Sequence, residues 1–323
     1  MMTDAVRKFA EQFAYQPQIE LGETLLPSYE HYVVAGLGGS HLAADLIQMW
    51  DPTIPLTVYS DYGLPVIPEN QRKTTLVIAS SYSGNTEETI DVYREARKQS
   101  LPLACLATGG KLLELAVADQ VPYIRLPHTG IQPRSALGLS ARAVLKLMGR
   151  IDILNNLSEL AELLHPEEYE TAGRALAEWL HNHVPVIYAS RRNSSLAYNW
   201  KIKMNETGKI PAFYNVLPEL NHNEMTGFDL KESIAHLCQT FAFIFLHDDA
   251  DHPRIQRRMN ILAQLYRDRG LAVEVIEMSD DHPYHKTFAS LLLADWTAIA
   301  IAERYGLESE QVPMVEEFKQ LMA

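Results

Sequence analysis

Short apolar runs rich in β-branched residues alternate with helical patterns along almost the whole chain. In the first half these strand-like runs lie at 31–35, 56–59, 75–79, 102–107 and 121–125. Helical patterns follow an opening helix at 3–13 and fill the gaps at 42–49, 86–99, 112–117 and 137–150. The strand-like runs are almost continuously apolar, as in strands that are covered on both faces. The alternation therefore predicts a mostly parallel sheet flanked by helices, a three-layer αβα fold.

A second series of the same kind begins near residue 184. Its strands are predicted at 184–190, 240–246 and 272–277, and its helices at 194–204, 254–269 and 288–305. The stretch 151–166 between the two series is mixed helix and loop. Because 323 residues suffice for two hydrophobic cores, we predict two α/β domains, 1–152 and 153–323.

Composition excludes several classes of partner. The chain has 41 acidic and 28 basic residues and a net charge of −13, which argues against a nucleic-acid partner. A small anionic ligand is still compatible, because a few local donors can outweigh the overall field. No run approaches the ~20 apolar residues that span a bilayer, so no membrane partner is expected. Cys105 and Cys238 lie in apolar runs, and the start MMTDAVRKFAEQF has no signal-peptide pattern, so we expect a cytoplasmic protein.

A glycine-rich loop, GLGGSH at 36–41, follows the first strand of the first half. It lacks the G-x-G-x-x-G pattern, since its sixth position is His41, and no Walker lysine follows, so no nucleotide cofactor is indicated. Its counterpart in the second half, ASRRNSS at 189–195, contains no glycine. The loop is either a tight strand-to-helix turn or a place where the backbone approaches a ligand.

A serine-rich loop, SSYSGNTEETI at 80–90, follows the third strand. One hydroxyl would suffice to cap the next helix, but Ser80, Ser81, Ser83 and Thr86 all carry one. Hydroxyls at the carboxyl end of a parallel strand, beside a helix N-terminus, form a suitable phosphate cradle. The alternative is a helix cap with additional serines.

The segments GLGGS, SYSGNTEET and PRSALG together resemble those of sugar isomerase (SIS) domains, which bind phosphorylated sugars. The resemblance implies two tandem flavodoxin-like SIS domains. It also implies that four hydroxyl residues grip the sugar phosphate and that the glycine loop contacts the substrate. Carried over to this chain, these are Ser40, Ser81, Ser83 and Thr86 for the phosphate, and Gly38 and Gly39 for the substrate.

Two further motifs, KIKMNETGK and PELNHNEMTGF, resemble those of the bifunctional phosphoglucose/phosphomannose isomerases within this superfamily. That resemblance implies that Glu206 carries a proton between C1 and C2, and that Arg134 stabilises the enediolate. His222 would assist ring opening in the neighbouring subunit of a homodimer. These types of residue suit the chemistry, because a partly buried carboxylate is a base, an imidazole titrates near neutrality and a cation stabilises an oxyanion. Taken singly, each of the three is also compatible with an ordinary surface or capping role.

The last long helix carries the remaining expected residues. The resemblance places Thr297 where this group has a threonine that admits the mannose epimer. Aligned through Thr297, the chain has Arg304 where the group usually has a lysine that contacts the ring oxygen. An arginine keeps the positive charge but does not act as an acid. A helix-face role for Thr297 is the competing interpretation.

The predicted activity is the interconversion of glucose 6-phosphate and mannose 6-phosphate with fructose 6-phosphate, through a cis-enediolate. The only predicted ligand is a phosphorylated hexose, with no cofactor and no metal. The cluster HDDADH at 247–252 has the composition of a cation site, but caps and turns explain it better. Two alternatives remain: an isomerase or deglycase acting on an aminosugar or fructosamine phosphate, and a non-catalytic sugar-phosphate sensor.

Overall fold

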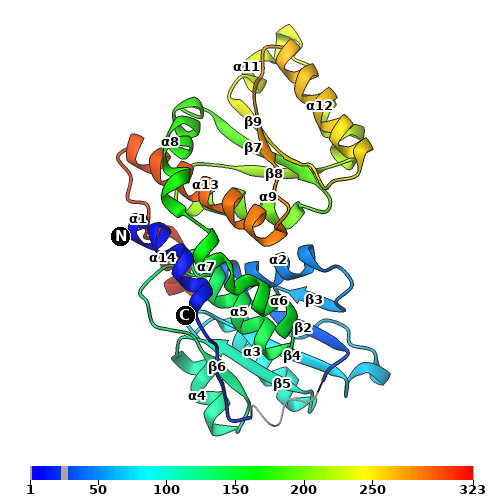
Figure 1. Cartoon of the computed structure of the whole chain (residues 1–323), viewed down its shortest axis with the longest axis vertical. Helices are drawn as coiled ribbons and strands as arrows, with labels where there is room; N and C mark the ends of the chain where they lie inside the picture. The colour runs from blue at the N-terminus through cyan, green and yellow to red at the C-terminus, as the bar shows by residue number, and fades with distance from the viewer. Residues whose placement is uncertain (1, 23–27, 323) are drawn as a thin grey trace. The chain divides into compact units, whose positions relative to one another are not determined.

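The computed structural model describes residues 2–22 and 28–322 (Figure 1). The chain divides into two compact units. The N-unit consists of Lys8–Leu164, and the C-unit combines Met1–Arg7 with His165–Ala323. Each unit has its own sheet and its own helices, and each is described separately below.

The sheet of the N-unit has six strands in the order β1-β6-β5-β4-β2-β3. All neighbours pair in parallel except β1 with β6. Every residue of β4 is buried, which agrees with a strand covered on both faces. The strands are β1 (Ile19–Glu20), β2 (His31–Ala35), β3 (Leu56–Tyr59), β4 (Thr75–Ser80), β5 (Leu103–Ala107) and β6 (Tyr123–Arg125).

Helices cover this sheet on both sides. On one face, Val77 and Cys105 pack against α3 and α4 in a single apolar cluster. Ile78 and Leu106 have the opposite parity along their strands and are buried as well, under α2 and α5, which pack on one another. The helical segments are η1 (Phe9–Ala14), η2 (Gly38–Ser40), α2 (Leu42–Trp50), η3 (Glu69–Gln71), α3 (Glu87–Lys98), α4 (Gly110–Ala118), η4 (Pro133–Ser135), α5 (Leu137–Leu147), α6 (Ile151–Ser158) and α7 (Leu160–Leu163).

The C-unit has a four-stranded sheet in the order β10-β9-β7-β8, parallel throughout. Its α12 lies on one face, and α8, α9 and α13 lie on the other (Figure 1). The strands are β7 (Val184–Ser190), β8 (Phe213–Leu217), β9 (Phe241–Asp248) and β10 (Ala272–Met278). The helical segments are α1 (Met2–Arg7), η5 (Pro166–Tyr169), α8 (Glu170–Trp179), α9 (Ser194–Glu206), η6 (Glu219–His222), α10 (Glu224–Gly227), η7 (Glu232–Ile234), α11 (Ala235–Cys238), α12 (Pro253–Asp268), α13 (Pro283–Arg304) and α14 (Pro313–Met322).

The predicted fold class is confirmed, because both units are α/β with parallel sheets. Two details differ from the prediction. The opening helix is broken after Arg7, and Arg7 belongs to the C-unit, where it pairs with Glu170 at 3.3 Å and lies over the Trp296 ring. The expected boundary after residue 152 falls inside α6, and the two units divide at 164/165.

The reason for the later division is visible in how α6 packs. The Arg142 guanidinium of α5 donates to the Leu154 carbonyl at 3.2 Å and to the Ser158 hydroxyl at 2.9 Å. Leu157 and Leu160 are fully buried. These contacts hold α6 and α7 to the N-unit, although their sequence reads as mixed helix and loop.

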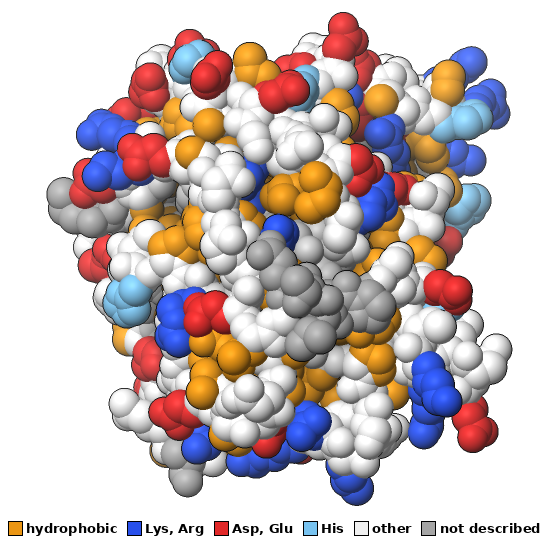
Figure 2. All heavy atoms as spheres, turned by 60° about the horizontal axis from the view of Figure 1, so that its bottom comes forward, with side chains coloured by type: hydrophobic (Ala, Val, Ile, Leu, Met, Phe, Trp, Pro, Cys, Tyr) orange, Lys and Arg blue, Asp and Glu red, His pale blue; other side chains and the backbone are white. Residues whose placement is uncertain are grey.

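Two general properties bear on partners. On the face shown in Figure 2, acidic, basic and hydrophobic side chains are interspersed, with no broad area of a single charge sign. Among the described residues, no helix has the length and apolar character needed to cross a membrane.

Candidate functional site

The glycine loop of the N-unit allows three segments to pack at backbone distance. A Cβ on Gly36 would lie 2.6 Å from the carbonyl oxygen of Ser80, at the end of β4. A Cβ on Gly39 would lie 2.6 Å from the carbonyl carbon of Pro133 and 2.7 Å from the amide nitrogen of Arg134. Any side chain at Gly39 would therefore push η4 away from the loop. The glycines bring the loop after β2, the loop after β4 and the PRSALG segment to one edge of the sheet.

The serine loop forms a compact ring of hydroxyl and amide groups. The hydroxyls of Ser81 and Thr86 are 2.8 Å apart, and the Gly84 amide donates to the Ser81 hydroxyl at 3.1 Å. The Asn85 amide donates to the Ser83 hydroxyl at 3.2 Å. Gly84 has φ +76°, and a Cβ there would collide with the Gly109 carbonyl oxygen, so only glycine fits.

Thr86 bears on the helix-cap interpretation of this loop. It stands at the N-cap of α3, but its side chain makes no capping hydrogen bond and contacts Ser81 instead. The Thr86 hydroxyl is therefore not used to cap the helix. The arrangement leaves the first turn of α3, with its positive dipole end, beside a group of hydroxyls, which suits an anion.

Ser40 joins the two loops. Its hydroxyl accepts a hydrogen bond from the Tyr82 amide at 2.9 Å, and its carbonyl accepts one from the Ser80 hydroxyl at 2.8 Å. Both Ser40 and Ser81 are buried within the chain. A hydroxyl that accepts in this way keeps its own proton for donation. Ser40 is thus both a brace between the loops and a candidate phosphate donor.

Arg134 lies in η4, next to Gly39, and only 2% of its surface is exposed. The turn that carries it is braced by Gln12, whose amide nitrogen donates to the Ser135 carbonyl at 2.7 Å. The Gln12 amide oxygen accepts from the Gly138 amide at 3.0 Å. The structure therefore gathers all seven predicted N-unit residues at one sheet edge: Gly38, Gly39, Ser40, Ser81, Ser83, Thr86 and Arg134. Sequence reasoning missed Gln12, because nothing local links it to a turn more than a hundred residues later.

Glu206 is the last residue of α9 in the C-unit and is half-buried. Its carbonyl oxygen accepts a hydrogen bond from the Lys209 ammonium at 2.6 Å. Nearby, the Asn205 side chain donates to the Ile210 carbonyl at 2.9 Å. The chain then turns at Gly208, where a Cβ would lie 3.5 Å from the Ala298 carbonyl oxygen. The carboxylate is thus mounted on a braced helix end beside α13.

His222 ends η6 and is exposed, whereas its motif neighbours serve as braces. The Asn221 side-chain oxygen accepts from Arg258 at 3.3 Å, and the Asn223 oxygen accepts from the Glu224 amide at 2.6 Å. The Glu224 carboxylate accepts from the Tyr188 hydroxyl at 2.5 Å, and burial, reinforced by this bond, raises the pKa of Tyr188 well above its ordinary value. The N-H-N-E loop therefore holds its two asparagines and its glutamate in place and presents the histidine.

Thr297 and Arg304 lie in different surroundings along α13. Thr297 is fully buried, and its hydroxyl donates to the Leu293 carbonyl at 2.7 Å. Arg304 is the last helical residue, with its side chain 39% exposed and 4.0 Å from the Glu178 carboxylate. Seven helical residues separate the two positions by about 10 Å. The structure therefore does not bring Arg304 to the turn that holds Thr297.

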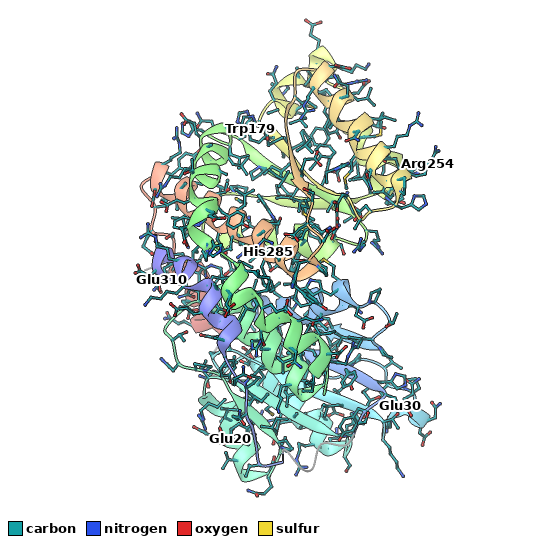
Figure 3. The ribbon with its side chains drawn as sticks, viewed as in Figure 1. Glu20, Glu30, Trp179, Arg254, His285 and Glu310 are labelled. Carbon is teal, nitrogen blue, oxygen red and sulfur yellow. The ribbon has the colours of Figure 1, made fainter. Side chains whose placement is uncertain are left out.

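At the corresponding sheet edge of the C-unit, polar side chains of this unit bond to one another. The Ser190 hydroxyl donates to Asp251 at 2.7 Å, and the Lys286 ammonium donates to Asp248 at 2.8 Å. Asn193 donates to Asp248 at 2.9 Å. Lys286 enters this network from the start of α13, where Figure 3 shows the neighbouring His285.

Side chains of the 247–252 cluster contact neighbouring residues of the C-unit. His247 contacts Glu277 at 2.7 Å, Asp249 accepts from Lys286 at 2.9 Å, and His252 caps α12 by accepting from the Arg254 amide. Within 2–22 and 28–322, no three His, Cys, Asp or Glu side chains group as a metal site.

Comparison with known proteins places the chain among phosphosugar isomerases. Residues 170–322 match the family described as the bacterial phospho-glucose isomerase C-terminal SIS domain. A bifunctional phosphoglucose/phosphomannose isomerase of Caldicellulosiruptor bescii is 33% identical, over 100% of this chain and 99% of the relative. The enzyme of the same name from Aquifex aeolicus is 30% identical, over 98% and 96%.

Among solved structures, a hypothetical protein from Thermus thermophilus superimposes with a TM-score of 0.70 at 18% identity, covering 99% of this chain and 87% of that one. At that identity the likeness shows the fold alone. The two relatives are matched over 100% and 98% of this chain, and so over both units. The chain therefore belongs to the bifunctional phosphoglucose/phosphomannose isomerase family.

Proposed function

We propose that the protein is an aldose–ketose isomerase that interconverts glucose 6-phosphate and mannose 6-phosphate with fructose 6-phosphate. The observation that carries this proposal is that the glycine loop with Ser40, the serine loop and the buried Arg134 come together at one edge of the N-unit sheet. Membership of the family supports the same conclusion.

The N-unit holds the phosphate in this proposal. Ser40, Ser81, Ser83 and Thr86 donate to its oxygens, and the α3 N-terminus adds backbone N–H groups. Gly38 and Gly39 allow the sugar to lie against the backbone of the loop. The phosphate does not react, so these contacts bind ground state and transition state alike and act mainly on KM.

Glu206 is the proposed base. Its carboxylate takes the proton from C2 of the open-chain aldose, the C2–H electrons form the C1–C2 double bond, and the carbonyl oxygen at C1 becomes the enediolate oxygen. The O2 hydroxyl proton then passes to O1, the C2–O2 bond becomes the carbonyl, and the same carboxylate returns its proton to C1, which gives the ketose. Arg134 stabilises the negative oxygen, and removal of one such donor costs about 2.7–4 kcal/mol in related cases.

His222 is the proposed ring-opening group. Its exposure on a braced loop supports a role towards a second copy of the chain, so that a homodimer has His222 of one subunit completing the site of the other. Arg304 lies at the exposed end of α13 beside Glu178 and is given no part in the reaction, and as an arginine it has no transferable proton, so His222 carries the ring-opening proton transfer alone. Thr297, with its hydroxyl bonded to the Leu293 carbonyl, is proposed to affect epimer choice through the position of its helix turn.

The reaction moves hydrogen within one molecule and needs no external oxidant, so neither a cofactor nor a metal enters the proposal. Cys105 and Cys238 are free and buried, which suits a reducing compartment, and we propose the cytoplasm.

The test is formation of fructose 6-phosphate from glucose 6-phosphate and, separately, from mannose 6-phosphate, with a chelator present. Turnover of both is expected. Turnover of glucose 6-phosphate alone would remove the role given to Thr297. No turnover, with sugar-phosphate binding retained, would favour a sensor, and turnover of glucosamine 6-phosphate alone would favour an aminosugar enzyme.

A further inference from the structure

A buried ion pair joins the helix of the proposed base to the long helix α13. The Lys203 ammonium lies 2.7 Å from the Asp295 carboxylate, and their side chains are 2% and 3% exposed. Two apolar side chains of similar size would stabilise such a contact equally well or better, because they avoid the desolvation of two charges. Stability alone therefore gives no reason for charges here, but a short charged hydrogen bond does fix the relative position of two helices.

Lys203 is connected to the end of α9 as well as to α13. It lies three residues before Glu206, in the last turn of the helix. Its carbonyl oxygen accepts from the Thr207 amide at 2.9 Å and from the Gly208 amide at 3.0 Å, and these bonds close the helix directly after Glu206. One residue thus links the helix end that carries the carboxylate to Asp295.

Two further contacts make this link stiff. Gly208, which follows α9, lies close to the Ala298 carbonyl oxygen of α13, one turn after Asp295, so the chain approaches α13 both before and after Glu206 in sequence. Lys209 holds the Glu206 carbonyl oxygen from the other direction. The ion pair adds a short polar contact between the last turn of α9 and α13, besides the hydrogen bond from Trp200 to Ser290 nearer the middle of α9.

We infer that the Lys203–Asp295 pair positions the Glu206 carboxylate, which makes Lys203 and Asp295 positioning residues of the reaction; this rests on the proposed function. Neither needs to touch the substrate. A base that moves by about 1 Å can lose 100-fold in rate, so the pair acts on kcat. Substrate affinity, which the phosphate loops of the N-unit supply, stays unchanged.

The experiment replaces the pair without leaving a charge buried. The variant K203M/D295L should fold with a melting temperature close to that of the parent. Its kcat for fructose 6-phosphate formation should fall about 10- to 100-fold, with KM within twofold. The variant K203R keeps the ion pair and should retain more than a tenth of kcat. If the double variant does not fold, the contrast between K203R and K203Q replaces it.

A matched control uses the second buried Lys–Asp pair on α13. Lys286 lies 2.8 Å from Asp248, with side chains 9% and 3% exposed, and belongs to no proposed catalytic contact. The variant K286M/D248L should lower the melting temperature, because Asn193 and the Ala250 amide also lose their acceptor Asp248, but it should leave kcat within twofold. A loss of kcat as large as that of K203M/D295L would overturn the inference, because any buried pair would then have the same effect.

A double-mutant cycle separates positioning from general structural damage. In the background of E206D, which shortens the base, K203M/D295L should cost much less than in the parent, because the geometry that it disturbs is already lost. Equal losses in the two backgrounds, or parent-level kcat in K203M/D295L, would overturn the positioning role. If E206Q and E206D were both fully active, the proposed base itself would be wrong, which is a different result.

Discussion

The two sheet edges at which α/β proteins bind ligands are built differently in the two units. In the N-unit, glycines open the edge and Ser81 and Thr86 line it, with a helix N-terminus left uncapped by its own N-cap residue. In the C-unit, Ser190 and Asn193 occupy the corresponding edge but bond to Asp251 and Asp248. One edge is available to an anion, and the other already holds carboxylates. The two α/β units thus differ in what lies at this place: hydroxyl and amide groups in the N-unit and carboxylates in the C-unit.

The largest expected effect tests whether the C-unit supplies the base. E206Q keeps the size of the side chain but cannot accept the C2 proton, so kcat should fall by about 100- to 10,000-fold, with KM for the sugar phosphate little changed. Steady-state kinetics with glucose 6-phosphate checks this. A variant with parent-level kcat would place the base elsewhere.

The next prediction tests the open edge of the N-unit. S83A removes one hydroxyl, and S81A/T86V removes the bonded pair, so KM should rise about 3- to 30-fold with a smaller change in kcat. The matched control is S190A, which removes a hydroxyl from the closed edge and should leave KM unchanged. If S190A raised KM as S81A/T86V does, the two edges would not differ in the way described.

A smaller effect concerns specificity. T297Q should lower turnover of mannose 6-phosphate relative to glucose 6-phosphate, because a longer side chain in a fully buried turn displaces it. The ratio of the two kcat/KM values is the measurement. Equal losses on both substrates would show that Thr297 is a packing residue only.

The smallest effect concerns the pH dependence of stability and the C-unit edge that holds Asp248 and Asp251. Burial raises the pKa of Asp248, but hydrogen bonds from Lys286, the Ala250 amide and Asn193 outweigh it, so the pKa lies below its ordinary value. A carboxyl with a lowered pKa contributes stability that is present above its unfolded pKa, about 4, and is lost as the pH falls through the folded value. K286M should remove part of that contribution, so that the C-unit loses less stability between neutral and acidic pH. Urea unfolding at pH 7 and in steps from about pH 5 down to about pH 2 measures the difference, because the contribution is lost below the unfolded pKa. An unchanged pH dependence would contradict the prediction.

Much of the fold followed from local pattern. The strand predicted at 31–35 matches β2 to the residue, because a buried parallel strand leaves a continuous apolar run. The strand predicted at 56–59 matches β3 to the residue, although β3 is an edge strand in which only Leu56 is buried. The strand β8 was missed, since its first residues, Phe213 and Tyr214, are exposed at the sheet edge and the run contains Asn215. An edge strand has less need of the apolar run that marks a central one.

The site residues could be predicted where they lie together in contiguous sequence motifs. The N-unit residues lie in three short segments, and the structure gathers them at one edge. Gln12 and the Lys203–Asp295 pair could not be found, because their partners are far away in the chain and each residue alone looks ordinary. Conversely, the position of Arg304 was inferred from its spacing to Thr297 along one helix. That spacing does not show that Arg304 lies at the exposed end of α13, because exposure depends on how the helix packs.

Residues 1–7 belong to the C-unit and residues 8–14 to the N-unit, which matters when fragments of the protein are designed. Because α1 packs on α13 and η5 within the C-unit, a fragment that starts at His165 lacks part of its own fold. A complete C-unit needs residues 1–7 restored to it, either as an added peptide or by a circular permutation that joins them beyond residue 323. Progressive deletion from residue 1 should accordingly destabilise the C-unit first, and the N-unit only once the deletion extends into η1.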